Sequence, residues 1–239
     1  LNQVISETIN SELPLIQAIL QHIFQAGGKR LRPLIVLLLA NHFGRIQMNQ
    51  QIELAAIIEF VHTATLLHDD VVDHSTLRRG RDTANAKWGN QATILVGDFL
   101  YARAFELLAI HSNPAIMQQL AQTTQLLATG ELMQLAQQRQ LITEATYLDT
   151  IYRKTAALFE ASSLCASLLA QQNQAVQDAC ALFGKHLGII FQIMDDILDY
   201  TANAADLGKQ IGDDLAEGKM TLPLIYAFEE SNVTDKALI

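Results

Sequence analysis

The sequence is poor in the residues that punctuate β-rich folds and in those that cross-link small secreted domains. Its 239 residues include 12 glycines and 4 prolines, which leaves little turn material for a β-sandwich or a β-barrel. Only two cysteines, Cys165 and Cys180, are present, so a disulfide scaffold is excluded and a reduced, intracellular protein is the simplest interpretation. The longest apolar run extends from Leu34 to Ala40, far short of the roughly 20 residues that a membrane-spanning helix needs. We therefore expect a helical, cytoplasmic protein with no transmembrane segment and no signal peptide.

Positive charge is also scarce. Sixteen Lys and Arg residues stand against 25 Asp and Glu, which gives a formal net charge of −9. Nucleic acid is excluded as a partner, because a phosphate backbone requires many clustered cations over a broad surface. Half of the residues are hydrophobic, which is ample for a large core.

Apolar residues recur at helical spacing along almost the whole chain. This pattern predicts an all-α fold, with helices near residues 2–25, 32–43, 50–73, 90–111, 114–137, 144–171, 173–200 and 219–230. The breaks between them are too short to be interdomain linkers. We therefore expect residues 1–239 to form a single domain, a large helical bundle.

One acidic motif occurs twice, each time after a strongly apolar stretch. Asp69-Asp70-Val71-Val72-Asp73 and Asp195-Asp196-Ile197-Leu198-Asp199 share the pattern Asp-Asp-x-x-Asp. Positions i and i+4 lie on the same face of a helix, so each copy stacks two carboxylates, which a hard cation such as Mg²⁺ would neutralise. A solvated helix end is an equally good interpretation of a single copy, but two copies favour a magnesium site.

Basic residues cluster close to a glycine pair and to the first acidic motif. Lys29, Arg30 and Arg32 follow Gly27-Gly28, and the run Arg78-Arg79-Gly80-Arg81 follows Asp73 within a few residues. Arg and Lys bind phosphate groups, although any one of them is more often a solvated surface charge. Together with two magnesium-type motifs, they predict a substrate that carries a diphosphate. No Walker loop, Gly-x-Ser-x-Gly, His-Glu-x-x-His or zinc-ligand spacing is present.

From these residues the chain resembles the trans-type isoprenyl diphosphate synthases, and among them the long-chain enzymes that make octaprenyl diphosphate. The resemblance extends from about Gly27 to Ala227 and rests on an ordered set of motifs: Gly-Gly-Lys-Arg-Leu-Arg-Pro at 27–33, the run 59–70 that ends in His-Asp-Asp, Arg-Arg-Gly at 78–80, Val-Gly-Asp-Phe-Leu at 96–100, Lys-Thr-Ala at 154–156, Phe-Gln-Ile-Met-Asp-Asp at 191–196 and Gly-Lys-Met-Thr-Leu-Pro at 218–223. It implies an all-α isoprenoid synthase fold with a central cavity, a homodimer, and head-to-tail condensation of isopentenyl diphosphate with an allylic diphosphate such as farnesyl diphosphate.

The resemblance also implies roles for individual residues. Two or three Mg²⁺ ions would be held by the aspartates of the two motifs, which are Asp69, Asp70, Asp73, Asp195, Asp196 and Asp199. The allylic diphosphate would be contacted by Arg78, Lys154, Thr155, Gln192, Lys209 and Lys219. The isopentenyl diphosphate would be held by Lys29, Arg32, His62 and Arg79.

Product length follows from small residues ahead of the first acidic motif. In the family, a bulky aromatic residue five positions before that motif stops chain growth early; here the position is Ala64, followed by Thr65. A long product of about C40, used for quinone side chains, is therefore expected. Leu107, Leu108 and Met117 are candidates for the deeper floor of the tunnel, although each of them is more often an ordinary core residue.

Several alternatives remain open at this point. The chain could be a geranylgeranyl-type synthase, a non-catalytic regulatory subunit or a terpene cyclase, although all six aspartates and the isopentenyl diphosphate residues are present. Family members usually continue with further helices beyond the position of Ile239. Residues 202–219 lack a helical period, and we expect them to form a lid that orders with substrate.

Overall fold

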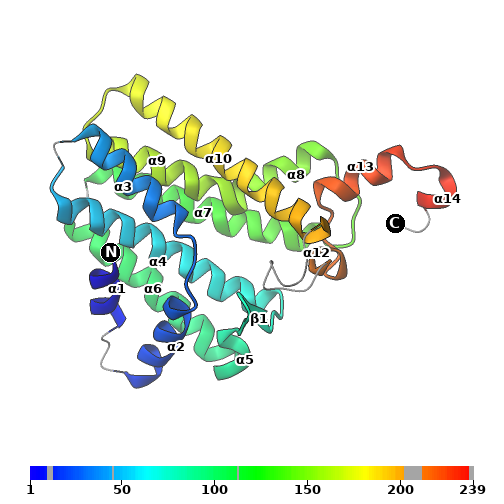
Figure 1. Cartoon of the computed structure of the whole chain (residues 1–239), viewed down its shortest axis with the longest axis horizontal. Helices are drawn as coiled ribbons and strands as arrows, with labels where there is room; N and C mark the ends of the chain where they lie inside the picture. Colours follow the sequence, from blue (N-terminus) through cyan, green and yellow to red (C-terminus); the bar gives the residue numbers. More distant parts are fainter. Residues whose placement is uncertain (10–12, 45, 112, 202–211, 237–239) are drawn as a thin grey trace.

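The protein is a bundle of helices, as the apolar periodicity predicts. A computed structural model describes residues 1–9, 13–44, 46–111, 113–201 and 212–236, and Figure 1 shows the arrangement of the helices. The long helices are α3 (Leu31–Phe43), α4 (Met48–Val72), α6 (Asn90–His111), α7 (Pro114–Gln137), α9 (Ala157–Leu169) and α10 (Gln174–Thr201). Within the described residues, none of the helices combines the length and the apolar character needed to cross a bilayer.

The core lies where the long helices meet. Helix α4 packs between α3 and α6, while α9 packs against α3, α7 and α10. The largest fully buried side chains include Phe60 of α4, Leu100 of α6 and Phe159 of α9. Because α4 and α9 are covered on several sides, they are apolar around most of their circumference, which explains the absence of a clean amphipathic stripe in their sequences.

Shorter elements complete the ends of the bundle. They are α1 (Asn2–Ile9), α2 (Pro14–Gln25), α5 (Ala84–Trp88), α8 (Glu144–Ile151), the π-helical turn η1 (Tyr152–Ala156), α12 (Asp213–Ala216), α13 (Leu222–Glu230) and α14 (Val233–Lys236). The prediction of a single helix over residues 2–25 is wrong, because α2 begins at Pro14. Proline favours the first turn of a helix. The helix expected over 144–171 is confirmed as one continuous stretch, but it contains the π-helical turn.

A small hairpin was not expected from the sequence. Strands β1 (Leu77–Arg78) and β2 (Arg81–Asp82) pair antiparallel, with Arg78 opposite Arg81. Arg79 and Gly80, the two residues between the strands, both have positive φ, at 54° and 71°, which is the pattern of a type I′ turn. The hairpin directly follows α4 and so fixes Arg78 and Arg79 beside the first acidic motif.

Candidate active site

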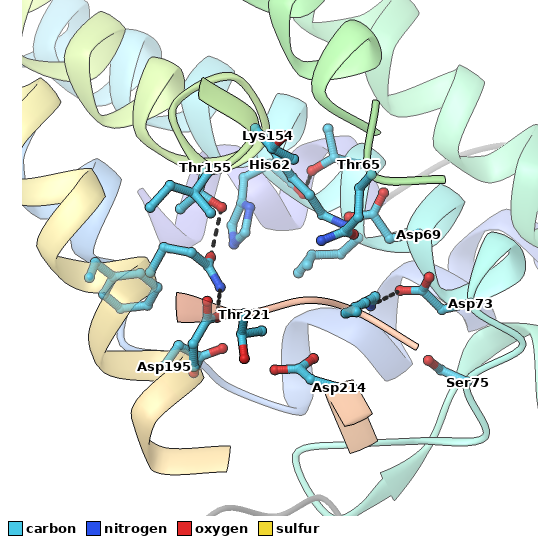
Figure 2. Close-up of a pocket in the computed structure, with 18 of the residues that line it drawn as sticks. His62, Thr65, Asp69, Asp73, Ser75, Lys154, Thr155, Asp195, Asp214 and Thr221 are labelled. Atoms are coloured by element: carbon cyan, nitrogen blue, oxygen red, sulfur yellow. Dashed lines mark hydrogen bonds and ion pairs between the residues drawn. The ribbon is translucent and has the colours of Figure 1, made fainter. Parts of the chain in front are cut away.

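A cavity at one end of the bundle has a volume of ≈ 630 Å³. Its wall is built from the start of α3, the end of α4, the β1–β2 hairpin, the ends of α7 and α8, the turn η1, α10 and the segment 214–221. Figure 2 shows Asp69 and Asp73 on one side of this cavity and Asp195 on the opposite side. The two acidic motifs therefore face a shared space.

Only part of each acidic motif lines this cavity. Asp69 of α4 and Asp73, the C-cap residue that follows this helix, are lining residues, and so are Asp195 and Asp196 of α10. Asp70 is not a lining residue: Arg78 donates from Nε to the Oδ1 atom of Asp70 at 2.8 Å, and the Nη2 atom of Arg78 lies 2.8 Å from the same oxygen. Asp199 is fully buried, and its Oδ2 atom accepts the backbone N–H of Asp214 at 3.3 Å. Asp70 and Asp199 are thus placed to hold neighbouring segments rather than a metal ion in the cavity.

Burial makes the first acidic motif electrostatically costly. The pKa of Asp69 is raised to about 7, chiefly because burial penalises the charged carboxylate and secondly because Glu131 is close. Burial also raises the pKa of Asp70, against the opposing effect of Arg78. A cation near Asp69 would offset this cost.

The donor set fits Mg²⁺ only in combination with a substrate. Asp69, Asp73 and Asp195 offer carboxylate oxygens, the ligands that Mg²⁺ prefers. Among the described residues, however, no three His, Cys, Asp or Glu side chains converge into one ligand cluster. Ions held here would have to complete their coordination with diphosphate oxygens and water, which is the usual arrangement for Mg²⁺ in phosphate-binding sites.

The cations expected for the allylic diphosphate line the same cavity. The Nζ atom of Lys154 lies 2.7 Å from Oε2 of Glu131 and donates to Oε1 of Gln134 at 2.6 Å. Lys219 Nζ lies 3.2 Å from Oδ2 of Asp73, and Asp73 and Glu217 help to raise the pKa of this lysine against the effect of burial. Thr155, Gln192 and Arg78 are also lining residues. Lys209, and with it most of the expected lid, lies outside the described residues.

Lys154 and Thr155 face the cavity from the π-helical turn. Because η1 adds a residue to one turn of the helix, it changes the direction in which the following side chains point. Gly130 of α7 permits the close approach that this requires, since a Cβ atom there would lie 2.5 Å from the backbone nitrogen of Lys154.

The residues expected for isopentenyl diphosphate lie together on the α3–α4 side. Arg32 donates from Nη1 to Nε2 of His62 at 3.3 Å, and its guanidinium lies 4.2 Å from the ring centre of Phe159. Burial lowers the pKa of Arg32 to about 10. Burial and three neighbouring arginines hold the pKa of His62 well below its ordinary value, so the imidazole is neutral.

Arg79 and Lys29 complete this basic wall. Arg79 donates from Nη1 to the backbone oxygen of Gly27, and Gly28 leaves room for the guanidinium, because a Cβ atom there would lie 2.6 Å from that same nitrogen. Lys29 lines the cavity beside them. Four positive or hydrogen-bonding groups from three separate sequence motifs therefore meet on one wall.

Several polar residues of the cavity were missed by the sequence analysis. Glu59 is 9% exposed, and its Oε2 atom is buried with no hydrogen-bond partner among the described residues. It belongs to the motif run 59–70 and lies three residues before His62, a spacing that could have identified it. Tyr147, Gln134 and Glu217 also line the cavity. Tyr147 lies two helical turns before Lys154, whereas the other two carry no signal beyond their residue type.

A second cavity of ≈ 270 Å³ adjoins the first between α4, α6 and α7. Thr65 and Asp69 line both cavities, and the deeper lining includes Tyr101, Phe105 and Leu127. Ala64, to which the sequence analysis also gave a chain-length role, is fully buried in the core and lines neither cavity.

The three residues suggested for the deeper floor lie elsewhere in the bundle. Leu107 and Leu108 belong to the buried core, Met117 packs against it, and none of them lines the second cavity. Position along a helix is visible in the sequence, but which face meets the cavity depends on how α4 and α6 pack. Of the two residues in the chain-length prediction, Thr65 is the one that lines these cavities.

Comparison with known proteins gives consistent matches over the whole chain. The family model for polyprenyl synthetase matches residues 13–239. Octaprenyl diphosphate synthase of Haemophilus influenzae is 48% identical over 239 residues, which cover 100% of this chain and 72% of that protein. All-trans-nonaprenyl-diphosphate synthase (geranyl-diphosphate specific) of Rhodobacter capsulatus is 48% identical over 240 residues, covering 100% of this chain and 74% of that protein. The crystal structure of a polyprenyl synthase from Caulobacter crescentus, complexed with calcium and isoprenyl diphosphate, has a TM-score of 0.94 at 42% identity and covers 99% of this chain and 72% of that one.

Proposed function

Because the chain belongs to the polyprenyl synthetase family, we propose that it condenses isopentenyl diphosphate head-to-tail with an allylic diphosphate to give a long-chain all-trans polyprenyl diphosphate. The observation that carries this proposal is that Asp69 and Asp73 face Asp195 across one cavity. Basic residues line the same cavity. A terpene cyclase would have no use for the second basic wall around Arg32 and Arg79.

The two diphosphates occupy different walls of the cavity. Lys154, Thr155, Gln192 and Lys219 line the part between the acidic motifs and hold the allylic diphosphate. Lys29, Arg32, His62 and Arg79 hold isopentenyl diphosphate on the α3–α4 side. This division brings two anionic substrates into one site without placing their charges against each other.

Magnesium is assigned to the carboxylates that line the cavity. Asp69 and Asp73 at the end of α4 and Asp195 on α10 would hold it, and when bound it would neutralise charge that builds on the leaving diphosphate. Asp196 is engaged with Tyr147 and Gln192, and Asp70 with Arg78. We therefore give these two aspartates, together with the buried Asp199, a supporting role.

The chain's own residues promote cleavage of the allylic C1–O bond. Lys154 is held by Glu131 and Gln134, so its charge is oriented toward the leaving diphosphate before substrate arrives. The alkene of isopentenyl diphosphate, fixed by the basic wall, attacks the resulting carbocation. The adduct then loses a proton, which we assign to the departing diphosphate.

The growing hydrocarbon tail leaves the acidic site through the second cavity. Thr65, which lines both cavities, lies where the tail would pass, and Tyr101, Phe105 and Leu127 offer apolar surface beyond it. Such an apolar path also keeps water from the carbocation. We propose a product of about C40 for a quinone side chain, made from farnesyl diphosphate in the cytoplasm; a geranylgeranyl-type product is the alternative.

The proposed assembly is a homodimer. Helix α6 leaves Ile94 and Leu95 exposed, at 41% and 66%, and burial of such side chains favours association. A catalytic role within a two-subunit enzyme, or a regulatory one, is the alternative.

One experiment tests the activity. The purified chain is incubated with Mg²⁺, farnesyl diphosphate and labelled isopentenyl diphosphate, and the products are sized by chromatography. Incorporation of isopentenyl units into long all-trans chains is expected, and Asp69→Ala should abolish it. Cyclised products without isopentenyl consumption would favour a cyclase, and full turnover by Asp69→Ala would remove the metal role of that residue.

A further inference from the structure

A line of hydrogen bonds crosses the wall of the cavity and connects three separate elements. Tyr147 of α8 donates its hydroxyl to Oδ2 of Asp196 at 2.6 Å. Gln192, one turn earlier on α10, donates from Nε2 to Oδ1 of the same carboxylate at 2.7 Å. Thr155 of η1 donates its hydroxyl to Oε1 of Gln192 at 2.8 Å. The sequence analysis gave a role to every member of this line except Tyr147.

The line of hydrogen bonds is protected from solvent at its Tyr147 end. Tyr147 is 3% exposed and Asp196 is 4% exposed. A buried carboxylate is stable only when donors satisfy its oxygens, and a short O–H···O⁻ bond is among the stronger ones available.

These contacts determine which way the Gln192 amide points. The Nε2 group must face Asp196, because a carboxylate cannot donate, and Oε1 must then face the Thr155 hydroxyl. The second Nε2 hydrogen of Gln192 and the oxygen lone pairs of Thr155 are left to interact with other groups of the cavity. If Asp196 turned, the Gln192 amide could rotate and the Thr155 hydroxyl would lose its acceptor.

We propose that Tyr147 is a positioning residue for the allylic diphosphate: by fixing the Asp196 carboxylate, it fixes the orientation of Gln192 and Thr155. This inference rests on the proposed function, which assigns these two side chains to the allylic substrate. Tyr147 acts only on this wall, because the isopentenyl diphosphate residues are carried by α3, α4 and the hairpin.

The test removes one oxygen atom. Tyr147→Phe keeps the packed ring but leaves the Oδ2 atom of Asp196 without that donor. The KM for farnesyl diphosphate should rise roughly ten- to a hundredfold, the range for one hydrogen bond to a charged group, while the KM for isopentenyl diphosphate stays within about twofold. Tyr226→Phe is the matched control, because its hydroxyl also donates to a carboxylate, Glu144, but lies on the exposed face of α13. It should leave both constants unchanged.

A double variant tests whether Tyr147 acts through Gln192. Gln192→Ala alone should raise the KM for farnesyl diphosphate, and adding Tyr147→Phe should raise it no further. Equal KM values for Tyr147→Phe and wild type, equal changes for both substrates, or effects that multiply in the double variant would each overturn the inference while leaving the proposed function intact. A wild-type chain that incorporates no isopentenyl diphosphate would overturn both.

Discussion

Asp69 is a residue at which function opposes stability. Its carboxyl group lies beside Glu131 and Asp73 in a largely buried position, and its pKa is raised to about 7. The folded protein therefore binds a proton more tightly than the unfolded chain does between the ordinary pKa near 3.8 and about 7. Stability is lost as the pH rises through that window.

Replacing this carboxylate should stabilise the metal-free protein. Asp69→Asn should raise the free energy of unfolding relative to wild type, and the gain should grow by about 1 kcal/mol between pH 6 and pH 8, as the charged form becomes dominant in the folded state. Urea unfolding in the presence of a chelator measures it. Mg²⁺ with pyrophosphate should reverse the order of the two proteins at pH 8; a variant less stable than wild type in chelator would contradict the account.

Thr65 is the residue at which a substitution should change product length most. It lines both cavities, so a ring placed there would block passage from the acidic site to the deeper lining. Thr65→Phe should shorten the product to about four or five isoprene units while short-chain turnover persists. Ala121→Phe, which adds a ring at an exposed position of α7, should leave product length unchanged, and long products from Thr65→Phe would show that the tail takes another route.

At the scale of residues, the sequence indicated which residue types form the site, but it indicated less well which way each side chain points. The i, i+4 spacing correctly placed Asp69 and Asp73 on one face. The directions of Asp70 and Ala64 were harder to predict, because the packing of neighbouring helices decides which side chains of a helix face the cavity. Lys219 meets Asp73 from 146 positions along the chain, a contact that no local pattern contains.

At the scale of elements, the π-helical turn η1 is the feature that most affects the site. It interrupts the helix that runs from Glu144 to Leu169 and directs Lys154 and Thr155 into the cavity. The sequence predicted a helix here, because a one-residue insertion hardly disturbs apolar periodicity. Gly130 on the facing helix is a local trace of the close contact.

The contact between α7 and η1 can be tested with one methyl group. Gly130→Ala would place a Cβ 2.5 Å from the Lys154 nitrogen and 2.8 Å from the Cβ atom of Arg153, so the π-helical turn must shift. We expect a loss of about 1–3 kcal/mol in unfolding free energy and a larger fall in kcat than in affinity for isopentenyl diphosphate. Unfolding curves and steady-state kinetics measure both, and an unchanged kcat would mean that the turn does not position Lys154.

At the scale of the whole molecule, the bundle holds the two acidic motifs on opposite sides of one cavity. The fold class and most helices followed from apolar periodicity, since packing on several sides leaves a strong signal. The hairpin did not, because it depends on the two turn residues Arg79 and Gly80. The break before α2 did not either, because it depends on a single residue, Pro14. The proposed homodimer belongs to this scale as well.

The exposed face of α6 gives a test of that assembly. Leu95→Glu places a charge where Leu95 is 66% exposed and should convert the dimer to a monomer in sedimentation equilibrium, because a buried unpaired charge opposes association. Leu141→Glu, at a 62% exposed position between α7 and α8, should leave the dimer intact. A wild-type monomer, or a Leu95→Glu variant that sediments as a dimer, would contradict this assembly.

The most direct measurement is the position of the metal. Crystals of the protein grown with Mn²⁺ and a non-reactive thiolo analogue of farnesyl diphosphate would locate the ions by anomalous scattering. The account predicts peaks beside Asp69 and Asp73 and beside Asp195, joined by the diphosphate of the analogue within the one cavity. Peaks confined to the outer surface, or an analogue bound away from both acidic motifs, would contradict it.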